Sequence, residues 1–190
     1  MKEIRFYSNS IETNNERTIE GKAICFNSTS NEIHGFYESI ERNAITDETI
    51  LKSDIVLLLE HNQDRGILGR CNNGKGSLEI SIKDDGVYFR CEMPKTSLGD
   101  EALEGIRRGD YNQCSFAFSL PQSNGDKWEK RDGKYYRTIT QINKLYDFSL
   151  VCHPAYNDTF VDCRGMEKLK EDEKELKEYY TDIRENFKVK

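Results

Sequence analysis

Short segments in which apolar and polar residues alternate run through most of the chain, and this is the pattern of half-buried β-strands. Such segments are residues 4–6, 19–25, 114–120 and 145–152. The continuous apolar run of residues 55–59 is short and begins Ile-Val, which favours a buried strand that stops at Glu60-His61-Asn62. The pattern therefore predicts a mostly β protein.

Two β-hairpins and two helical segments complete the predicted elements. The hairpins are residues 78–91, with a turn at Asp84-Asp85-Gly86, and residues 128–142, with a turn at Asp132-Gly133. Helical spacing occurs in residues 43–52, and again between the N-cap candidates of residues 94–100 and the helix stop at Gly109. The expected class is α+β with few helices.

The composition changes after Gly165. Residues 166–190 are dominated by Glu, Lys and Asp, and their apolar residues fall near helical spacing. These apolar residues are Leu169, Leu176, Tyr180, Ile183 and Phe187. We therefore expect a main domain of residues 1–165 and a charged, amphipathic helical tail of residues 166–190.

Composition excludes several classes of protein. The chain has 190 residues, of which 33% are charged, and no apolar stretch approaches a membrane span. The first residues lack the apolar region of a secretory signal, so a cytosolic protein that does not enter membranes is expected. The net charge of -6, with scattered Lys and Arg, argues against a nucleic-acid binder.

No cofactor and no metal are expected. The 6 cysteines form no C-x-x-C pair, and we interpret them as reduced thiols. The 3 histidines, His34, His61 and His153, show no H-E-x-x-H spacing, and no glycine-rich nucleotide motif is present. His61 follows a buried strand, where catalytic groups are common, although an isolated surface histidine more often has no function.

Two strand patterns offer partners for His61. Ser115, Ala117 and Ser119 share one face of their predicted strand, and these small residues leave room for a substrate. Asp147 and Ser149 share one face of a later strand, where the carboxylate would need a partner. Strands that face solvent would explain both patterns equally well.

A nucleophilic serine needs a base within hydrogen-bond reach, and that base needs a third group to orient it. Ser115, His61 and Asp147 supply these three types from three predicted strands. Sequence spacing alone cannot bring them together, and it does not decide whether Ser119 or Ser149 contributes.

Six segments, in this order, resemble the prohead proteases of tailed phages, whose fold is related to herpesvirus assemblin. They are EGKAICFN (20–27), FYESIERNAI (36–45), VLLLEHNQDRGILGR (56–70), GSLEISIKDDGVYFRCEMPKT (76–96), IRRGDYNQCSFAF (106–118) and LYDFSLVCHPAYNDT (145–159). No single segment is specific to the family, but the ordered set is. The resemblance covers roughly residues 17–164 of the chain.

The resemblance implies a compact, assemblin-like β-barrel and a serine endopeptidase with Ser115 as nucleophile, His61 as base and Asp147 as the third group. The acid is more often Glu in this family, and assemblins use a second histidine, which would be His153. We favour Asp147 because a carboxylate stabilises an imidazolium better than a neutral imidazole does. By the same resemblance, Arg164 is a candidate to support the oxyanion hole.

The implied substrates lie inside the assembling prohead, in the host cytoplasm. They are the scaffolding protein or the scaffolding segment of the capsid protein, the portal, and the protease itself. Assemblin-like enzymes are activated by dimerisation, so a homodimer is compatible with the resemblance. The tail would be a docking element or a segment lost by self-cleavage, or else a solvated helix that caps the domain.

Three alternatives belong to other classes. An inactive family member would act only as an assembly partner, but every catalytic residue type is present. A β-barrel binding module would need clustered aromatics or a basic groove, and the sequence indicates neither. A zinc hydrolase lacks the ligand spacing.

Overall fold

The computed structural model describes residues 2–7, 11–13, 17–33 and 35–152. His34, His153, Arg164, the domain boundary at residue 165 and the tail of residues 166–190 lie outside the described residues. No helix in the described ranges is long and apolar enough to cross a membrane.

A six-stranded sheet carries most of the long-range pairing. Its strands, in order, are β1 (Glu3–Tyr7), β10 (Gln113–Ser119), β13 (Lys144–Val151), β5 (Asp54–Leu59), β6 (Gly69–Asn72) and β7 (Lys75–Gly76). Neighbouring strands are antiparallel except β13 and β5, which run parallel. Strands from the beginning, middle and end of the described chain therefore lie side by side.

Two smaller sheets pack around this one. The first has the order β2 (Ile11–Thr13), β3 (Thr18–Cys25), β9 (Gly86–Glu92) and β8 (Leu78–Lys83). The second has the order β11 (Asp126–Arg131), β12 (Lys134–Ile139) and β4 (Phe36–Ile40). Both predicted hairpins are present, as β8–β9 and β11–β12, with Asp132 and Gly133 at positive φ in the second turn.

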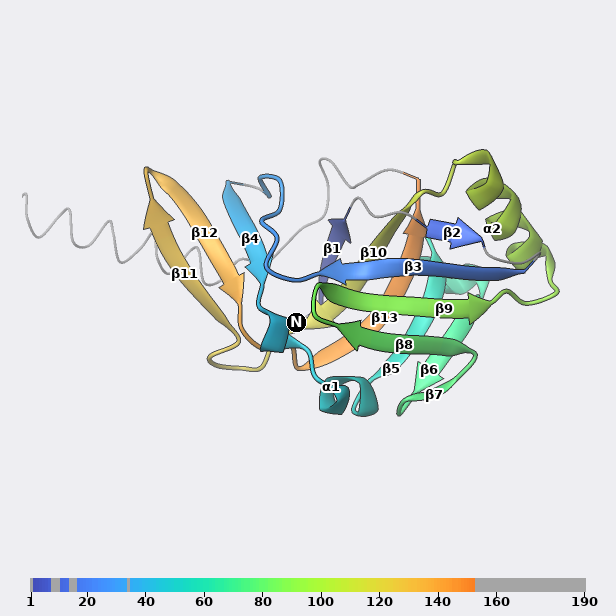
Figure 1. The fold of residues 1–190 in the computed structure, drawn as a ribbon, viewed down its shortest axis with the longest axis horizontal. Coiled ribbons are helices and arrows are strands. Elements are labelled where there is room, and N and C mark those ends of the chain that lie inside the picture. Colours follow the sequence, from blue (N-terminus) through green and yellow to red (C-terminus); the bar gives the residue numbers. More distant parts are fainter. Residues whose placement is uncertain (1, 8–10, 14–16, 34, 153–190) are drawn as a thin grey trace, which may run out of the picture.

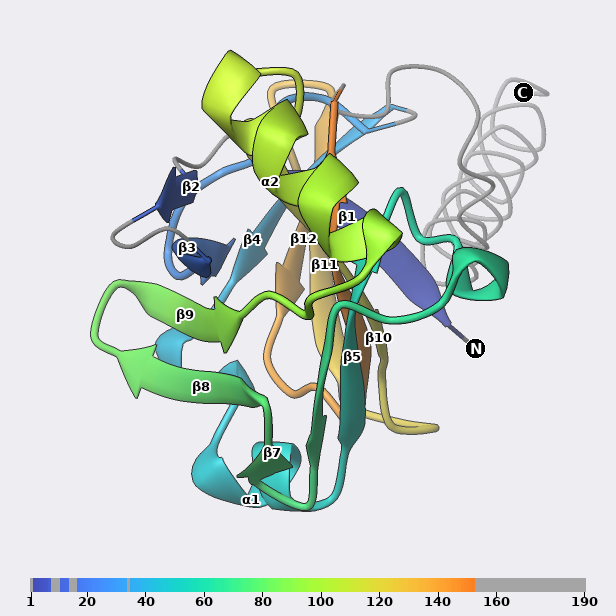
Figure 2. The ribbon, with the colours of Figure 1, turned by 90° about the vertical axis from the view of Figure 1, so that its right-hand side faces the viewer.

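The main core lies between the six-stranded and four-stranded sheets, whose strands cross steeply (Figures 1 and 2). Buried residues of both sheets form one cluster, in which the rings of Phe89 and Phe148 lie 6.1 Å apart. Such face-to-face packing buries the apolar side of each alternating strand. The mostly β class with few helices is therefore confirmed.

The predicted closed barrel is not found. Among the described strands, β1 and β7 are the two edges of the six-stranded sheet, and no sheet closes on itself. The apolar faces are covered by packing one sheet on another, so closure is not required to bury them. The alternation in the sequence cannot distinguish these arrangements, because both bury every second residue.

In the part of the chain that the structure describes, two α-helices and two 3₁₀ turns connect the strands. They are α1 (Asp47–Leu51), α2 (Ser97–Arg108), η1 (Arg42–Ala44) and η2 (Gln63–Arg65). Thr96 caps the start of α2 through its side chain, and Gly109 ends it in the left-handed region at φ 82°. The segment 43–52, predicted as one helix, is divided between η1 and α1, because Ile45 between them is extended.

Candidate active site

Ser115 lies on β10, in the interior of the six-stranded sheet, with β1 on one side and β13 on the other. Its neighbours Cys114 and Phe116 belong to the main core, so alternation along the strand turns Ser115 to the opposite face. The Ser115 side chain is 0% exposed. The sequence pattern of this strand thus predicts its core face correctly, but the opposite face is buried as well, with Ala117 0% and Ser119 4% exposed.

His61 stands in the turn that follows β5. Glu60 and His61 both have positive φ, 53° and 55°, a conformation that non-glycine residues rarely adopt and that costs about 1–3 kcal/mol each. The turn is held to β13, because Glu60 N–H donates to Leu150 O (3.0 Å) and Glu60 Oε1 accepts from Cys152 N–H (2.8 Å). Two left-handed residues in succession reverse the chain at the end of β5.

Asp147 lies on β13, between the strand of Ser115 and the strand that leads to His61. It pairs with Ala117 on β10 and Val56 on β5. The pairing with β10 shifts next to this position, because Leu145 pairs with Phe118 and Tyr146 is left as an extra residue. This β-bulge bends the strand beside Asp147, as bulges near functional sites commonly do.

The structure brings these three side chains into one hydrogen-bonded row. His61 Nε2 lies 2.5 Å from Ser115 Oγ, and His61 Nδ1 lies 2.5 Å from Asp147 Oδ1. The ionised carboxylate only accepts hydrogen bonds, so Nδ1 carries the hydrogen and Nε2 faces the serine as an acceptor. Residues separated by 54 and 86 positions in the chain meet here.

The hydroxyl of Ser115 has a second acceptor. Its Oγ lies 2.7 Å from the carbonyl oxygen of Arg5 on β1. A serine has one hydroxyl hydrogen, so this bond competes with the bond to His61 Nε2. The β1 strand is held by ion pairs that its buried Glu3 and Arg5 form with Glu38 and Arg137.

Two further donors reach Asp147. Ser149 Oγ donates to Asp147 Oδ1 (3.0 Å) and lies 3.1 Å from His61 Nδ1, whereas Lys2 Nζ donates to Asp147 Oδ2 (2.8 Å). Burial by itself would raise the pKa of the Asp147 carboxyl, but the hydrogen bonds and charges of His61 and Lys2 together lower it below 3.8. The carboxylate therefore stays ionised.

The two serines that the sequence could not rank differ in their surroundings. Ser149 contacts both His61 and Asp147, whereas Ser119 accepts a hydrogen bond from the Tyr146 hydroxyl (3.1 Å). Lys2 was not predicted, because a single lysine near the start of a chain carries no pattern that marks it. Its contact with Asp147 depends on the pairing of β1 with β10.

Cys114 is next to Ser115 in sequence, but its thiol is not suited to act as a nucleophile. Its thiol is fully buried on the core face, and burial raises its pKa to about 12. A thiol in this state carries almost no thiolate at neutral pH. The Ser115 hydroxyl, by contrast, lies within hydrogen-bond distance of His61 Nε2.

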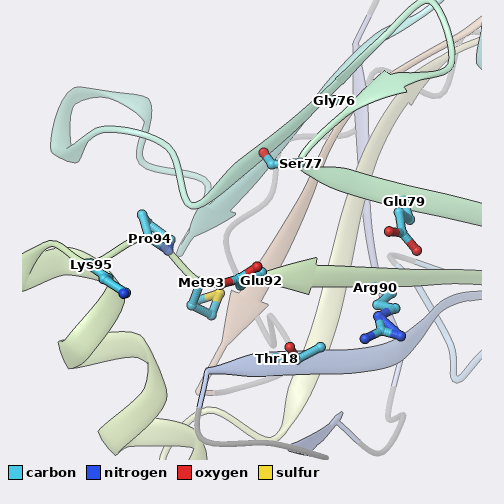
Figure 3. Close-up of a pocket in the computed structure, with 9 residues that line it drawn as sticks. All are labelled: Thr18, Gly76, Ser77, Glu79, Arg90, Glu92, Met93, Pro94 and Lys95. Carbon is cyan, nitrogen blue, oxygen red and sulfur yellow. The ribbon is translucent and has the colours of Figure 1, made fainter.

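A hollow of about 320 Å³ opens beside the row and includes Lys2, Asp147, Tyr146 and Ile67 in its lining. A second hollow, of about 370 Å³, lies elsewhere, where the chain leaves β9 through Met93 and Pro94 towards α2 (Figure 3). It contains none of the three residues of the row. In the part of the chain that the structure describes, no group of 3 or more His, Cys, Asp or Glu residues could hold a metal ion.

Two comparisons with known proteins found a match. The model of the family described as caudovirus prohead serine protease matches residues 4–172. Among solved structures, the chain is similar to the bacteriophage T4 capsid assembly protease gp21, with 15% identity and a TM-score of 0.49, over 81% of this chain and 98% of that one. The search of curated proteins found no match.

Proposed function

This chain belongs to the caudovirus prohead serine proteases and is a serine peptidase; from this we propose that it cleaves prohead proteins with Ser115 as nucleophile, His61 as general base and Asp147 as the orienting acid. The observation that supports the assignment is the row of contacts in which His61 Nε2 lies 2.5 Å from Ser115 Oγ and Nδ1 lies 2.5 Å from Asp147 Oδ1. Both distances are within hydrogen-bond reach, and the contact between Nε2 and Oγ is the path for proton transfer.

The proposed reaction proceeds through an acyl-enzyme. Ser115 Oγ attacks the carbonyl carbon of the scissile bond while its proton passes to His61 Nε2. His61 then gives this proton to the leaving amine, and the peptide C–N bond breaks. A water molecule attacks the resulting ester, again with His61 as the base, and releases the carboxylic acid and free Ser115.

Asp147 acts on His61 and is not itself protonated. Its ionised carboxylate accepts from Nδ1–H, which keeps Nε2 available as the base, and it stabilises the imidazolium that forms. The low pKa of this carboxyl is consistent with the role, because a protonated acid would provide neither effect.

Access to the nucleophile requires movement. Ser115 is 0% exposed and the His61 side chain is 14% exposed, so a substrate carbonyl reaches Oγ only after a neighbouring group shifts. The hollow beside Asp147 is the adjacent space into which a substrate side chain could enter. Binding of the substrate or of a partner protein would supply this movement.

The proposed substrates are the scaffolding protein or the scaffolding segment of the capsid protein, the portal and the protease itself. Cleavage would take place inside the prohead, in the host cytoplasm, where substrates are concentrated. A homodimer is proposed as the active form. The tail of residues 166–190, separate from a protease domain of residues 1–165, would dock the enzyme or be removed by self-cleavage.

Co-expression with the capsid or scaffolding protein of the same phage tests the proposal. Intact-mass analysis should find cleaved substrate with the unaltered chain and none with Ser115→Ala, because the alanine has no nucleophile. Ser119→Ala is the matched control, since this buried serine on the same strand contacts Tyr146 and not His61. It should cleave like the unaltered chain.

Each other outcome has a definite meaning. Cleavage by Ser115→Ala would exclude Ser115 as the nucleophile and remove the reason for the roles of His61 and Asp147. An uncleaved substrate with the unaltered chain would instead favour a non-enzymatic assembly partner. The mass of the mature enzyme tests the tail, because an intact C-terminus would exclude its loss by self-cleavage.

A further inference from the structure

The hydroxyl of Ser149 is enclosed between the two groups that are proposed to act behind the nucleophile. Its Oγ lies 3.0 Å from Asp147 Oδ1 and 3.1 Å from His61 Nδ1, while these two atoms lie 2.5 Å from each other. The three atoms form a closed triangle. Ser149 is 0% exposed, so its hydroxyl is shielded from bulk water.

We propose that Ser149 is a positioning residue that holds the His61 imidazole and the Asp147 carboxylate in their reactive arrangement. This inference rests on the proposed function of Ser115, His61 and Asp147. It adds a fourth side chain that touches neither the substrate nor the reacting atoms.

The direction of the hydrogen bonds supports this role. The only hydrogen of the Ser149 hydroxyl points to Asp147 Oδ1, which is ionised and can only accept. The oxygen lone pairs of Ser149 are then free to face Nδ1–H of His61. Nδ1–H is thus bordered by two acceptors, which favours the tautomer that leaves Nε2 unprotonated.

The same arrangement stabilises the charged intermediate. When His61 takes the proton from Ser115, the positive imidazolium faces Asp147 Oδ1 and the negative end of the Ser149 hydroxyl dipole. Because the groups are already oriented, they need not reorganise during the reaction. The loss of Ser149 should therefore slow chemistry rather than weaken substrate binding.

The register of the sheet explains how this side chain comes to lie there. Ser149 is directly opposite Ser115 on β10 and opposite Leu58 on β5. It thus stands on the strand between the nucleophile and the strand that ends before His61. A serine at this position has the length to reach both His61 and Asp147, whereas an alanine would leave one acceptor position of Asp147 unfilled.

The kinetics of labelling with a fluorophosphonate probe test the inference, because this probe reacts with an activated serine and gives separate constants for binding and chemistry. Ser149→Ala should lower the maximal labelling rate about fivefold to tenfold, the size of one typical net hydrogen bond, and leave the half-saturating probe concentration unchanged. Ser119→Ala should change neither constant. Circular dichroism and thermal unfolding establish that each variant is folded.

A second pair of variants isolates the hydroxyl even where alanine disturbs packing. Ser149→Thr and Ser149→Val have nearly the same shape and differ only in the hydroxyl. The threonine variant should be labelled about fivefold to tenfold faster than the valine variant. The low-field proton resonance of Nδ1–H should be retained with threonine and shifted or broadened with valine.

Two failures remain distinguishable. The role of Ser149 would be overturned, and the proposed function left intact, if folded Ser149→Ala and the unaltered chain had the same maximal labelling rate. The same conclusion would follow from equal rates of Ser149→Thr and Ser149→Val. Failure of the probe to label Ser115 in the unaltered chain, in the presence of its substrate protein, would contradict the proposed function itself. A rise in the half-saturating concentration without a change in rate would also refute a positioning role.

Discussion

Replacement of the Asp147 carboxylate by an amide should select the inactive tautomer of His61. In Asp147→Asn only one of the two terminal atoms accepts hydrogen bonds, whereas the carboxylate now receives donors on both oxygens. Lys2, an ammonium 2.8 Å from Oδ2, has no acceptor function, so the amide oxygen is drawn towards it. The amide NH₂ then faces His61 Nδ1 and converts it to an acceptor.

The expected loss follows from this change of tautomer. With the hydrogen on Nε2, His61 donates to Ser115 and can no longer take its proton. A misplaced tautomer of this kind, together with the lost stabilisation of the imidazolium, lowers activity about 10³–10⁴-fold, or about 4–5.5 kcal/mol. The fold should be preserved, because the amide has the same shape as the carboxylate.

Fluorophosphonate labelling and cleavage of the substrate protein both measure the effect. The matched control is Asp85→Asn, the same chemical change at an exposed side chain that pairs with Lys22 and lines neither of the two hollows described above. It should remain within about twofold of the unaltered chain, because exposed ion pairs contribute little.

The orientation of the amide provides an internal test. Adding Lys2→Met to Asp147→Asn removes the cation that attracts the amide oxygen, so activity should recover about fivefold to tenfold. The reasoning is refuted if folded Asp147→Asn retains more than about a tenth of the activity. A double variant that is no more active than Asp147→Asn would show that Lys2 does not set the amide orientation.

Two further predictions concern stability and reactivity. Burial would raise the pKa of Glu3, but its hydrogen bond with Arg137 and the charges of Arg5 and Arg137 lower it below 4.5. Ionised Glu3 therefore stabilises the fold above that pH. This stabilisation is lost as the pH falls through the lowered pKa. Glu3→Gln should thus lower the free energy of unfolding by about 3 kcal/mol at pH 7 and by progressively less in acid, as urea unfolding at several pH values would measure. A difference in unfolding free energy between variant and unaltered chain that does not change with pH would contradict this. Iodoacetamide should leave Cys91 and Cys114 unmodified in the native chain, because both are buried and burial raises the pKa of Cys91 to about 11. Peptide mapping that finds either residue alkylated before unfolding would refute their burial.

The hydrophobic pattern was sufficient for the elements near the site, because burial on one face of a strand leaves a direct record in the sequence. Alternation around Ser115 predicts both the strand β10 and the face on which the hydroxyl lies. The turn signals predict both hairpins, and the cap residues predict the ends of α2. The order of the motifs in the chain also indicates the family that the comparisons show.

The closed barrel was not correctly predicted, for a related reason. Alternation records that one face of each strand is buried, but not what covers it. A barrel and two crossed sheets give the same pattern in each strand. Only the pairing of strands far apart in the chain, such as β1 with β10, distinguishes them.

The sequence by itself therefore determined most of the elements, the chemical types in the row and the class of enzyme. The tertiary structure alone decided that His61, Ser115 and Asp147 meet, because this requires the parallel pairing of β13 with β5, the bulge at Tyr146 and the left-handed turn at Glu60 and His61. It also decided that Ser149 and Lys2 contact Asp147, while Ser119 does not. Local patterns record local burial, whereas register and long-range pairing depend on contacts that form only when the whole sheet assembles.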